Sequence, residues 1–196
     1  MIDTQQEADG EALRRTLEAR GWPARPLTGE PPAVDALNTR WLTGTDSYDL
    51  LDDDELTRAW LDQHGLHRPD AALPDVRRRL REARSVLAAT VADAGDLTAV
   101  NGLLDHGRIK LSLTLHGQTE TAEVGDPARH AAFVCARDFA RLITDAPGRV
   151  RKCANPPCPL HFTDTSRKGE RRWCSMSLCG NRAKAQRHRD RLQGSM

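Results

Sequence analysis

The chain has 196 residues, of which 38% are hydrophobic and only 4% aromatic, so aliphatic side chains must build most of its core. That hydrophobic content is enough to exclude wholesale disorder, and no run of 18 apolar residues predicts a membrane-spanning helix. The N-terminus is polar from its first residues and does not predict a secretory signal, so we expect a cytoplasmic protein without a membrane partner.

The net charge of +1 hides a strong asymmetry along the chain. Residues 1–148 carry 17 Lys/Arg against 25 Asp/Glu, a net of −8, whereas residues 149–196 carry 12 against 3, a net of +9. Such a split indicates two units with different partners. The basic unit is a candidate for binding a polyanion, and a solvated charged tail is the competing interpretation.

The first 30 residues are expected to form a peripheral, mobile arm, with a short helix over 11–20 followed by four prolines. From Val34 onward, apolar residues recur at helical spacing. They predict four helices, near residues 34–42, 50–63, 74–91 and 97–104. Asp52 or Asp53 is expected to cap the second of these helices.

Residues 108–124 change to a period of two, which is typical of a half-buried strand. Ile109, Leu111, Leu113 and Leu115 alternate with polar residues, and a return strand after Gly117 completes a β-hairpin. A last helix is expected from Asp126–Pro127 to about residue 145. The hairpin and this helix are a candidate self-association face, and the simpler interpretation is that the apolar strand face packs on the helices.

This first unit shows little chemistry, so we expect no enzyme. The single cysteine, Cys135, lies on an apolar helix face and is read as a buried, inert thiol. Five scattered histidines are read as capping or surface residues, and the acidic run 52–54 as a helix start. The histidines are His64, His67, His106, His116 and His130. A ligand site for a small-molecule effector is possible around Asp35, Asn38 and Arg40, although a cap and hydrogen-bond network explains these residues more simply.

The second unit contains two cysteine pairs, and each pair has four residues between its members. The pairs are Cys153 with Cys158 and, fifteen residues later, Cys174 with Cys179. Reduced thiols clustered in this way favour metal binding over disulfides, and four cysteines predict one closed, structural zinc site per chain. His161 is the rival ligand, and we expect it to lie at the surface or beside the site instead.

The spacing also places the cysteines on their elements. Cys174 and Cys179 are five residues apart, about 140° around a regular helix, so they cannot both face one metal from a single helix. We expect Cys174 in a turn and Cys179 in the first turn of a helix over 179–193. Because this unit has few core residues, it is expected to need zinc in order to fold.

Basic side chains surround the predicted zinc site and are the candidate DNA contacts. They are Arg167, Lys168, Arg171 and Arg172 in the loop, and Arg182, Lys184, Arg187, Arg189 and Arg191 on the helix. The loop arginines are expected to meet phosphates, and Arg182, Arg187 and Arg189 to reach base edges. For Arg182, bracing the fold is the alternative role.

Residues 153–191 resemble the CGNR zinc finger, through the string Cys179-Gly180-Asn181-Arg182 and the surrounding residues 162–166, 171–176 and 183–185. Upstream, the segment Asp35-Ala-Leu-Asn38-Thr39-Arg40 and the helical region to about 145 resemble the ABATE domain that usually precedes this finger. The family is regarded as stress-induced transcription regulators, and the resemblance implies DNA binding through the finger.

Taken together, the sequence predicts a mainly α fold with one β-hairpin. A peripheral arm (1–30), an ABATE-like helical domain (31–147) and a CGNR-type zinc finger ending in a basic helix (149–193) are expected. The expected function is a zinc-dependent, DNA-binding transcriptional regulator of the stress response. Its finger would contact double-stranded DNA, while the helical domain senses a signal or forms a homodimer. The alternative is a protein- or RNA-binding adaptor acting on the transcription machinery.

Overall fold

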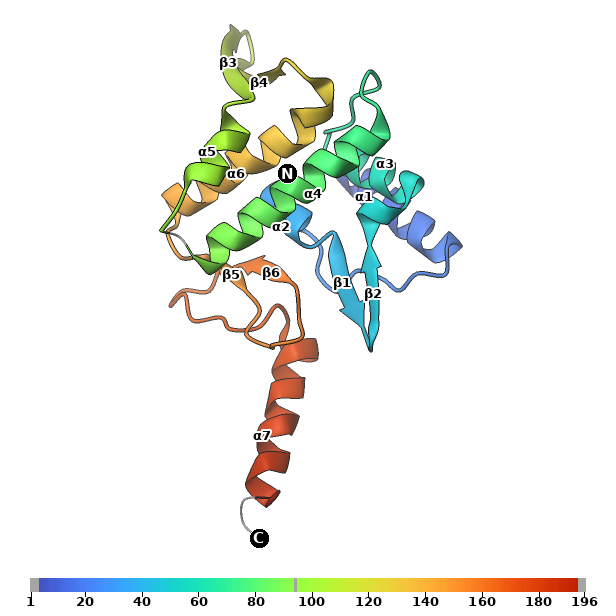
Figure 1. Ribbon diagram of the computed structural model, residues 1–196, viewed down its shortest axis with the longest axis vertical. Coiled ribbons are helices and arrows are strands. Elements are labelled where there is room, and N and C mark those ends of the chain that lie inside the picture. The colour runs from blue at the N-terminus through green and yellow to red at the C-terminus, as the bar shows by residue number, and fades with distance from the viewer. Residues whose placement is uncertain (1–3, 94, 194–196) are drawn as a thin grey trace.

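The computed structural model describes residues 4–93 and 95–193, without the side chains of residues 4–9, 187, 188, 192 and 193. In this part of the chain, helices α1 to α6 form the body of the molecule and α7 projects from it (Figure 1). The strands form three two-stranded antiparallel sheets, β1–β2, β3–β4 and β5–β6. The mainly helical class is confirmed, with two small sheets more than the one hairpin expected. No helix in the described ranges combines the length and apolarity needed to cross a membrane.

The N-terminal helix belongs to the core, which corrects the expected peripheral arm. Helix α1 (Thr4–Ala19) starts earlier than predicted and packs on α3 (Asp54–Gln63). Leu13 and Leu17 lie one helical turn apart and are each only 3% exposed. Two leucines at this spacing form an apolar stripe that needs another element to cover it.

The segment expected as one helix over 34–42 changes structure in its middle. Helix α2 (Pro32–Leu37) is buried along most of its length, and the chain then turns into β1 (Arg40–Thr43), which pairs with β2 (Asp46–Asp49). Gly44 supplies the positive φ of +64° in the connecting turn. Trp41 stacks on its cross-strand partner Tyr48, with ring centroids 5.6 Å apart. Aromatic packing across the two strands therefore stabilises a β-hairpin here, although the spacing of the apolar residues predicts a helix.

The other predicted helices form as expected. A 3₁₀ turn (Leu50–Asp52) leads into α3, where the carboxylate of Asp53 accepts from the Leu56 N–H at 2.9 Å. Helix α4 (Leu73–Ala92) buries its apolar stripe, and α5 (Thr98–Leu104) follows. After the 3₁₀ turn Pro127–Arg129, α6 (His130–Asp145) packs against α2, α4 and α5. The resulting core includes Cys135 and Phe139, which are both buried, as predicted.

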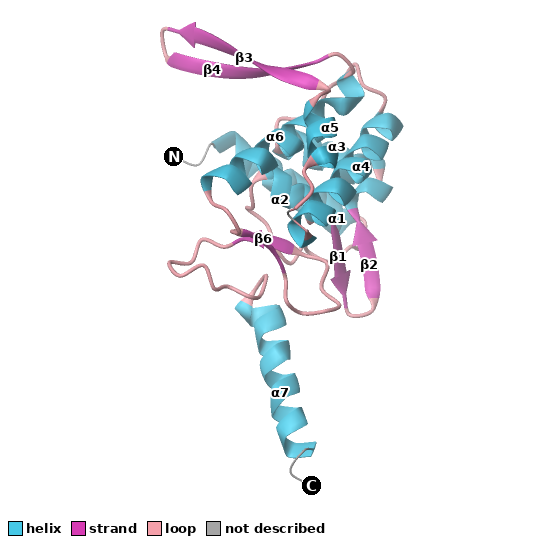
Figure 2. Ribbon diagram, turned by 60° about the vertical axis from the view of Figure 1, so that its left-hand side comes forward, coloured by secondary structure: helices cyan, strands magenta, loops and turns pink. Residues whose placement is uncertain are grey.

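The hairpin of β3 (Gly107–Thr114) and β4 (Gly117–Val124) forms as predicted but is not half-buried. Its base is tight against α6, since a Cβ at Gly107 would lie 2.9 Å from the Phe133 ring. Its outer part reaches away from the helices (Figure 2), and Leu111, Leu113 and Leu115 are 59%, 87% and 103% exposed. The simpler interpretation, that this apolar face packs on the helices, is therefore wrong.

The C-terminal unit packs directly on the helical body. Its short strands β5 (Val150–Lys152) and β6 (His161–Thr163) contact α4 and α2, respectively. The Asn38 side-chain amide donates to the His161 carbonyl at 2.9 Å and accepts from the His161 N–H at 2.8 Å. Phe162 is completely buried and belongs to the same hydrophobic cluster as the helices. One continuous core therefore joins the two units.

Candidate metal centre and nucleic-acid interface

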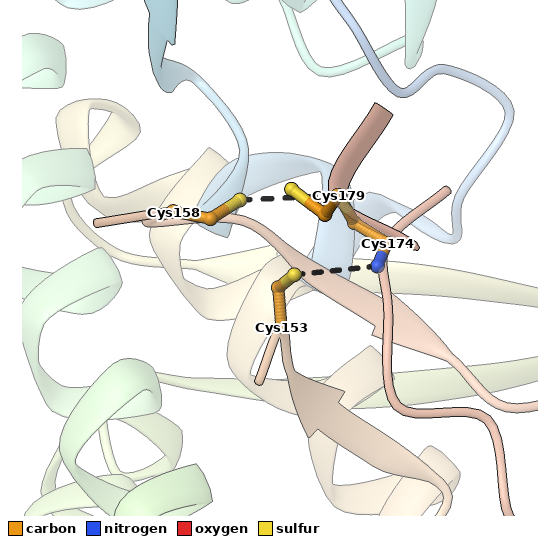
Figure 3. Close-up of side chains that lie close together, drawn as sticks. All are labelled: Cys153, Cys158, Cys174 and Cys179. Atoms are coloured by element: carbon orange, nitrogen blue, oxygen red, sulfur yellow. Dashed lines mark hydrogen bonds between the residues drawn. The ribbon is translucent and has the colours of Figure 1, made fainter. Parts of the chain in front are cut away.

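Four cysteine side chains point toward one another: Cys153, Cys158, Cys174 and Cys179 (Figure 3). Their sulfur atoms all lie within 4.8 Å of one another, and the residues are only 2% to 9% exposed. Zinc takes four thiolates in a tetrahedron, and a set of four leaves no position open for substrate. The donor set fits one structural zinc ion, as predicted.

Two turns bring the sulfurs together. In the first, the N–H of Cys158 donates to the Asn155 carbonyl at 2.9 Å and closes a turn through two prolines, while the N–H of Cys153 donates to the Leu160 carbonyl at 2.9 Å. In the second, Cys174 follows an irregular segment and Cys179 lies in the π-helical turn Met176–Gly180 that opens α7 (Asn181–Gln193). This placement agrees with the expected turn and helix start.

Hydrogen bonds and burial shift the pKa values of the cysteine thiols in the site. The sulfurs of Cys158 and Cys174 are 3.8 Å apart, and a hydrogen bond from Cys174 lowers the pKa of Cys158 to about 6. The same hydrogen bond, together with burial, raises the pKa of Cys174. Burial also raises the pKa of Cys179 to about 11, although Asn155 donates to its sulfur at 3.4 Å. A divalent cation removes this competition for protons, because thiolates are its ligands.

His161 is not a ligand in this arrangement. It is 5% exposed, lies on β6 against Asn38, and is absent from the cluster of four sulfurs. Burial lowers its pKa to about 4, so the imidazole is neutral at pH 7. From the sequence it is expected at the surface or beside the site, and the structure places it in the buried contact with the helical body.

The loop between the cysteine pairs is held by Asp164 and Arg171. The Asp164 carboxylate accepts from the Ser166 hydroxyl at 2.6 Å and the Arg171 N–H at 2.9 Å, and hydrogen bonds from Ser166 hold its pKa at about 2. The Arg171 guanidinium donates to the carbonyls of Trp173 and Cys174 and lies 4.3 Å from the centre of the Phe162 ring. Arg171 is therefore occupied in bracing the finger. Sequence reasoning missed this role, although the Asp and Ser of residues 163–166 are typical of a side-chain-closed turn.

Gly180 fixes how α7 leaves the zinc site. A Cβ at this position would lie 2.7 Å from the sulfur near the flexible end of the exposed Met176 side chain, so that side chain would have to move. Asn181 then starts α7, and its side-chain amide donates to the Ser177 carbonyl at 3.4 Å. Glycine at this position leaves room for the Met176 side chain beside the start of α7.

Most predicted DNA contacts are exposed and have no carboxylate partner. Within the described residues, no ion pair is formed by Arg167, Lys168, Arg172, Arg182, Lys184 or Arg189. Arg191 is also exposed but has a further interaction, and the Arg187 side chain lies outside the described part of the structure. Exposed cations therefore collect on the loop and along α7.

Family models match both parts of the chain. Residues 30–146 match the ABATE model, described as "Putative stress-induced transcription regulator", and residues 149–192 match the CGNR zinc finger. The first match covers more than half of the chain. The chain belongs to the ABATE family. No curated protein matches this sequence.

Within the ABATE domain, the three residues considered for a ligand site have different partners. Asp35 is 1% exposed and is held by Arg25 at 2.6 Å, Trp60 at 2.8 Å and His64 at 2.8 Å. The Asn38 side chain is used by the CGNR finger, as described above. Arg40 is exposed on β1 and donates to the Ser47 hydroxyl at 3.3 Å. Asp35 and Asn38 thus serve the hydrogen-bond network that was the simpler interpretation.

Proposed function

We propose that this ABATE protein is a zinc-dependent, DNA-binding transcriptional regulator whose CGNR finger contacts double-stranded DNA. The observation that carries the proposal is the contrast in ion pairing between the two units. In the ABATE domain most arginines are neutralised by a carboxylate, as Arg77 is by Asp54 and Arg84 by Asp49, both at 2.6 Å. Six exposed cations of the finger form no ion pair within the described residues, which suits a surface that meets phosphates: Arg167, Lys168, Arg172, Arg182, Lys184 and Arg189.

The form of α7 supports duplex DNA as the partner. The helix projects from the body in both ribbon views (Figures 1 and 2), and every described side chain on it is exposed except the half-buried Ala183. A helix that is polar all round gains little from its own packing, so a partner must supply the missing contacts. The major groove of DNA, about 12 Å wide, admits one helix of this kind.

Selection from a random pool tests the proposal. The full zinc-loaded chain is incubated with random duplex DNA, the retained molecules are sequenced, and affinity is measured against salt. We expect an enriched motif and a log–log slope of about −0.9 per phosphate, which for five or six phosphates is near −5. Equal retention of all sequences, or preference for RNA competitor over duplex DNA, would favour the adaptor function instead.

The same proposal assigns the ABATE domain a regulatory rather than a catalytic role. Its exposed hairpin leucines support self-association. The proposal also includes a response to stress through a small-molecule effector. It further includes a cytoplasmic location, where the thiols stay reduced. Light scattering of the full chain at increasing concentration tests the self-association, and a constant monomer mass would contradict it.

A further inference from the structure

A groove lies between the first cysteine turn and one side of α7. It has a volume of about 470 Å³ and is lined by Asn155 and Pro156 of that turn, by Arg172 and Trp173, and by residues of α7. Three of its lining residues are arginines: Arg172, Arg182 and Arg189. None of its described lining residues is acidic. The groove therefore presents concentrated positive charge in a concave surface, which focuses the attraction for an anion.

Helical phase decides which side chains of α7 face this groove. At 100° per residue, positions 182, 186 and 189 fall within about 60° of one another, whereas 184 and 191 fall on the opposite side. The lining residues agree, since Arg182, Gln186 and Arg189 line the groove and Lys184 does not. The basic residues of α7 thus divide into a groove face and an outer face.

We propose that this groove seats one sugar–phosphate strand of duplex DNA, and that Gln186 and Arg189 read base edges from its α7 wall. The inference rests on the proposed function and goes further, because it names the reading face. Arg172, positioned by its stacking 5.2 Å from the Trp173 ring, and Arg182, at the base of α7, meet phosphates. Arg189 is two helical turns farther out and reaches the major-groove edges, where Arg pairs with guanine and Gln with adenine.

Hydrogen bonds within α7 hold the two readers together in the free protein. Arg189 donates to the Gln186 amide oxygen at 2.6 Å, and the Gln186 amide donates to Asp190 at 2.8 Å. On DNA these groups exchange intrahelical partners for base edges, so the two side chains approach neighbouring base pairs from one face. The sequence alone predicts base reading by Arg182, Arg187 and Arg189, and the groove changes that set to Gln186 and Arg189.

The test compares two substitutions that remove the same charge from opposite faces of α7. Affinity of the full, zinc-loaded chain is measured for the duplex selected by the wild type and for a scrambled duplex. We expect Arg189→Ala to lose roughly tenfold to a hundredfold on the selected duplex and to relax the preference at one position. The control Lys184→Ala should weaken both duplexes by the same small factor, and Gln186→Ala should relax an adjacent position.

Tryptophan fluorescence gives an independent measurement. The other three tryptophans lie outside the finger, Trp41 and Trp60 in the ABATE domain and Trp22 before it, so a change in emission on adding DNA should come from Trp173 and vanish in Trp173→Phe. If the wild type selects a duplex but Lys184→Ala loses as much sequence preference as Arg189→Ala, the groove is not the reading face. The proposed function would then stand without this assignment. Failure of the wild type to select or bind duplex DNA would overturn the proposed function and the groove with it.

Discussion

Asp35 is the residue on which several segments of the ABATE domain depend. Its carboxylate lies between Arg25, Trp60 and His64, so it joins the segment after α1 to both α2 and α3. Burial alone would raise the pKa of Asp35, but the charge of Arg25 and the hydrogen bond from His64 hold it at about 2. The carboxylate is therefore strongly favoured in the folded protein.

Replacing Asp35 with Asn should leave the buried Arg25 without its counter-charge. We expect Asp35→Asn to lower the free energy of unfolding by about 3–5 kcal/mol at pH 7, measured by urea denaturation. Because the folded pKa lies below the ordinary value, the wild-type advantage is present above about pH 4 and is lost as the pH falls toward 2. An advantage of wild type over variant that stayed constant down to pH 2 would contradict this account.

Two adjacent arginines should separate folding from DNA binding. Arg171 bonds to the carbonyls of Trp173 and Cys174, whereas Arg172 is exposed on the groove. Arg171→Ala should cost about 2 kcal/mol of stability and make zinc easier to extract with a chelator. Arg172→Ala should keep zinc and melting temperature while weakening all DNA sequences alike. Identical zinc retention in the two variants would show that Arg171 does not brace the site.

Among the elements, the β3–β4 hairpin has the largest exposed apolar surface. Leu111 and Leu113 share one face of β3, and the strand edge is unpaired in the described chain. Apolar edge strands of this kind favour pairing with another strand. In an antiparallel pair of two β3 strands centred on Leu111, Lys110 would lie opposite Ser112 and Arg108 opposite Thr114. No like charges would then face each other.

A charge on the leucine face should therefore prevent self-association. We expect Leu113→Asp to shift the full chain toward the monomer mass in light scattering, with unchanged circular dichroism. Thr119→Asp is the matched control, because position 119 pairs with Ser112 and lies on the opposite face. A dimer that survived Leu113→Asp and dissociated with Thr119→Asp would assign the contact to the other face.

The elements also show what the sequence could and could not predict. Long periodic segments such as α4 and α6, the alternation of β3 and the cysteine spacing were sufficient, because each pattern repeats over several turns or pairs. The β1–β2 pair was missed, since its stability comes from Trp41 packing on Tyr48 and Trp22, a contact outside the local spacing. The bracing role of Arg171 was missed for a related reason: its backbone carbonyl partners leave no trace in residue composition.

For the whole molecule, zinc removal should affect both units to different degrees. Chelation of the full chain, or Cys179→Ser, should unfold residues 150–193 while most helical circular dichroism survives. The melting temperature should also fall, because the finger buries Phe162 in the shared core and bonds to Asn38. Cys135→Ala, which changes a cysteine outside the cluster, should keep one zinc per chain in metal analysis. Full zinc occupancy in Cys179→Ser would contradict the assignment of Cys179 as a zinc ligand.

Gly180 lies at the base of α7, where a small change in backbone angle moves the far end of the helix by a large distance. Helix α7 spans 13 residues, or about 20 Å, so a tilt of about 5° at its base moves its far end by roughly 1.7 Å. Gly180→Ala places a methyl group against Met176, and we expect the start of α7 to shift while the four sulfurs stay in place. Hydrogen bonds to bases fail over such a displacement, so this variant should keep its zinc and its salt-dependent attraction to DNA yet lose sequence preference. Sequence preference and overall affinity for DNA would then be separable properties of the zinc finger.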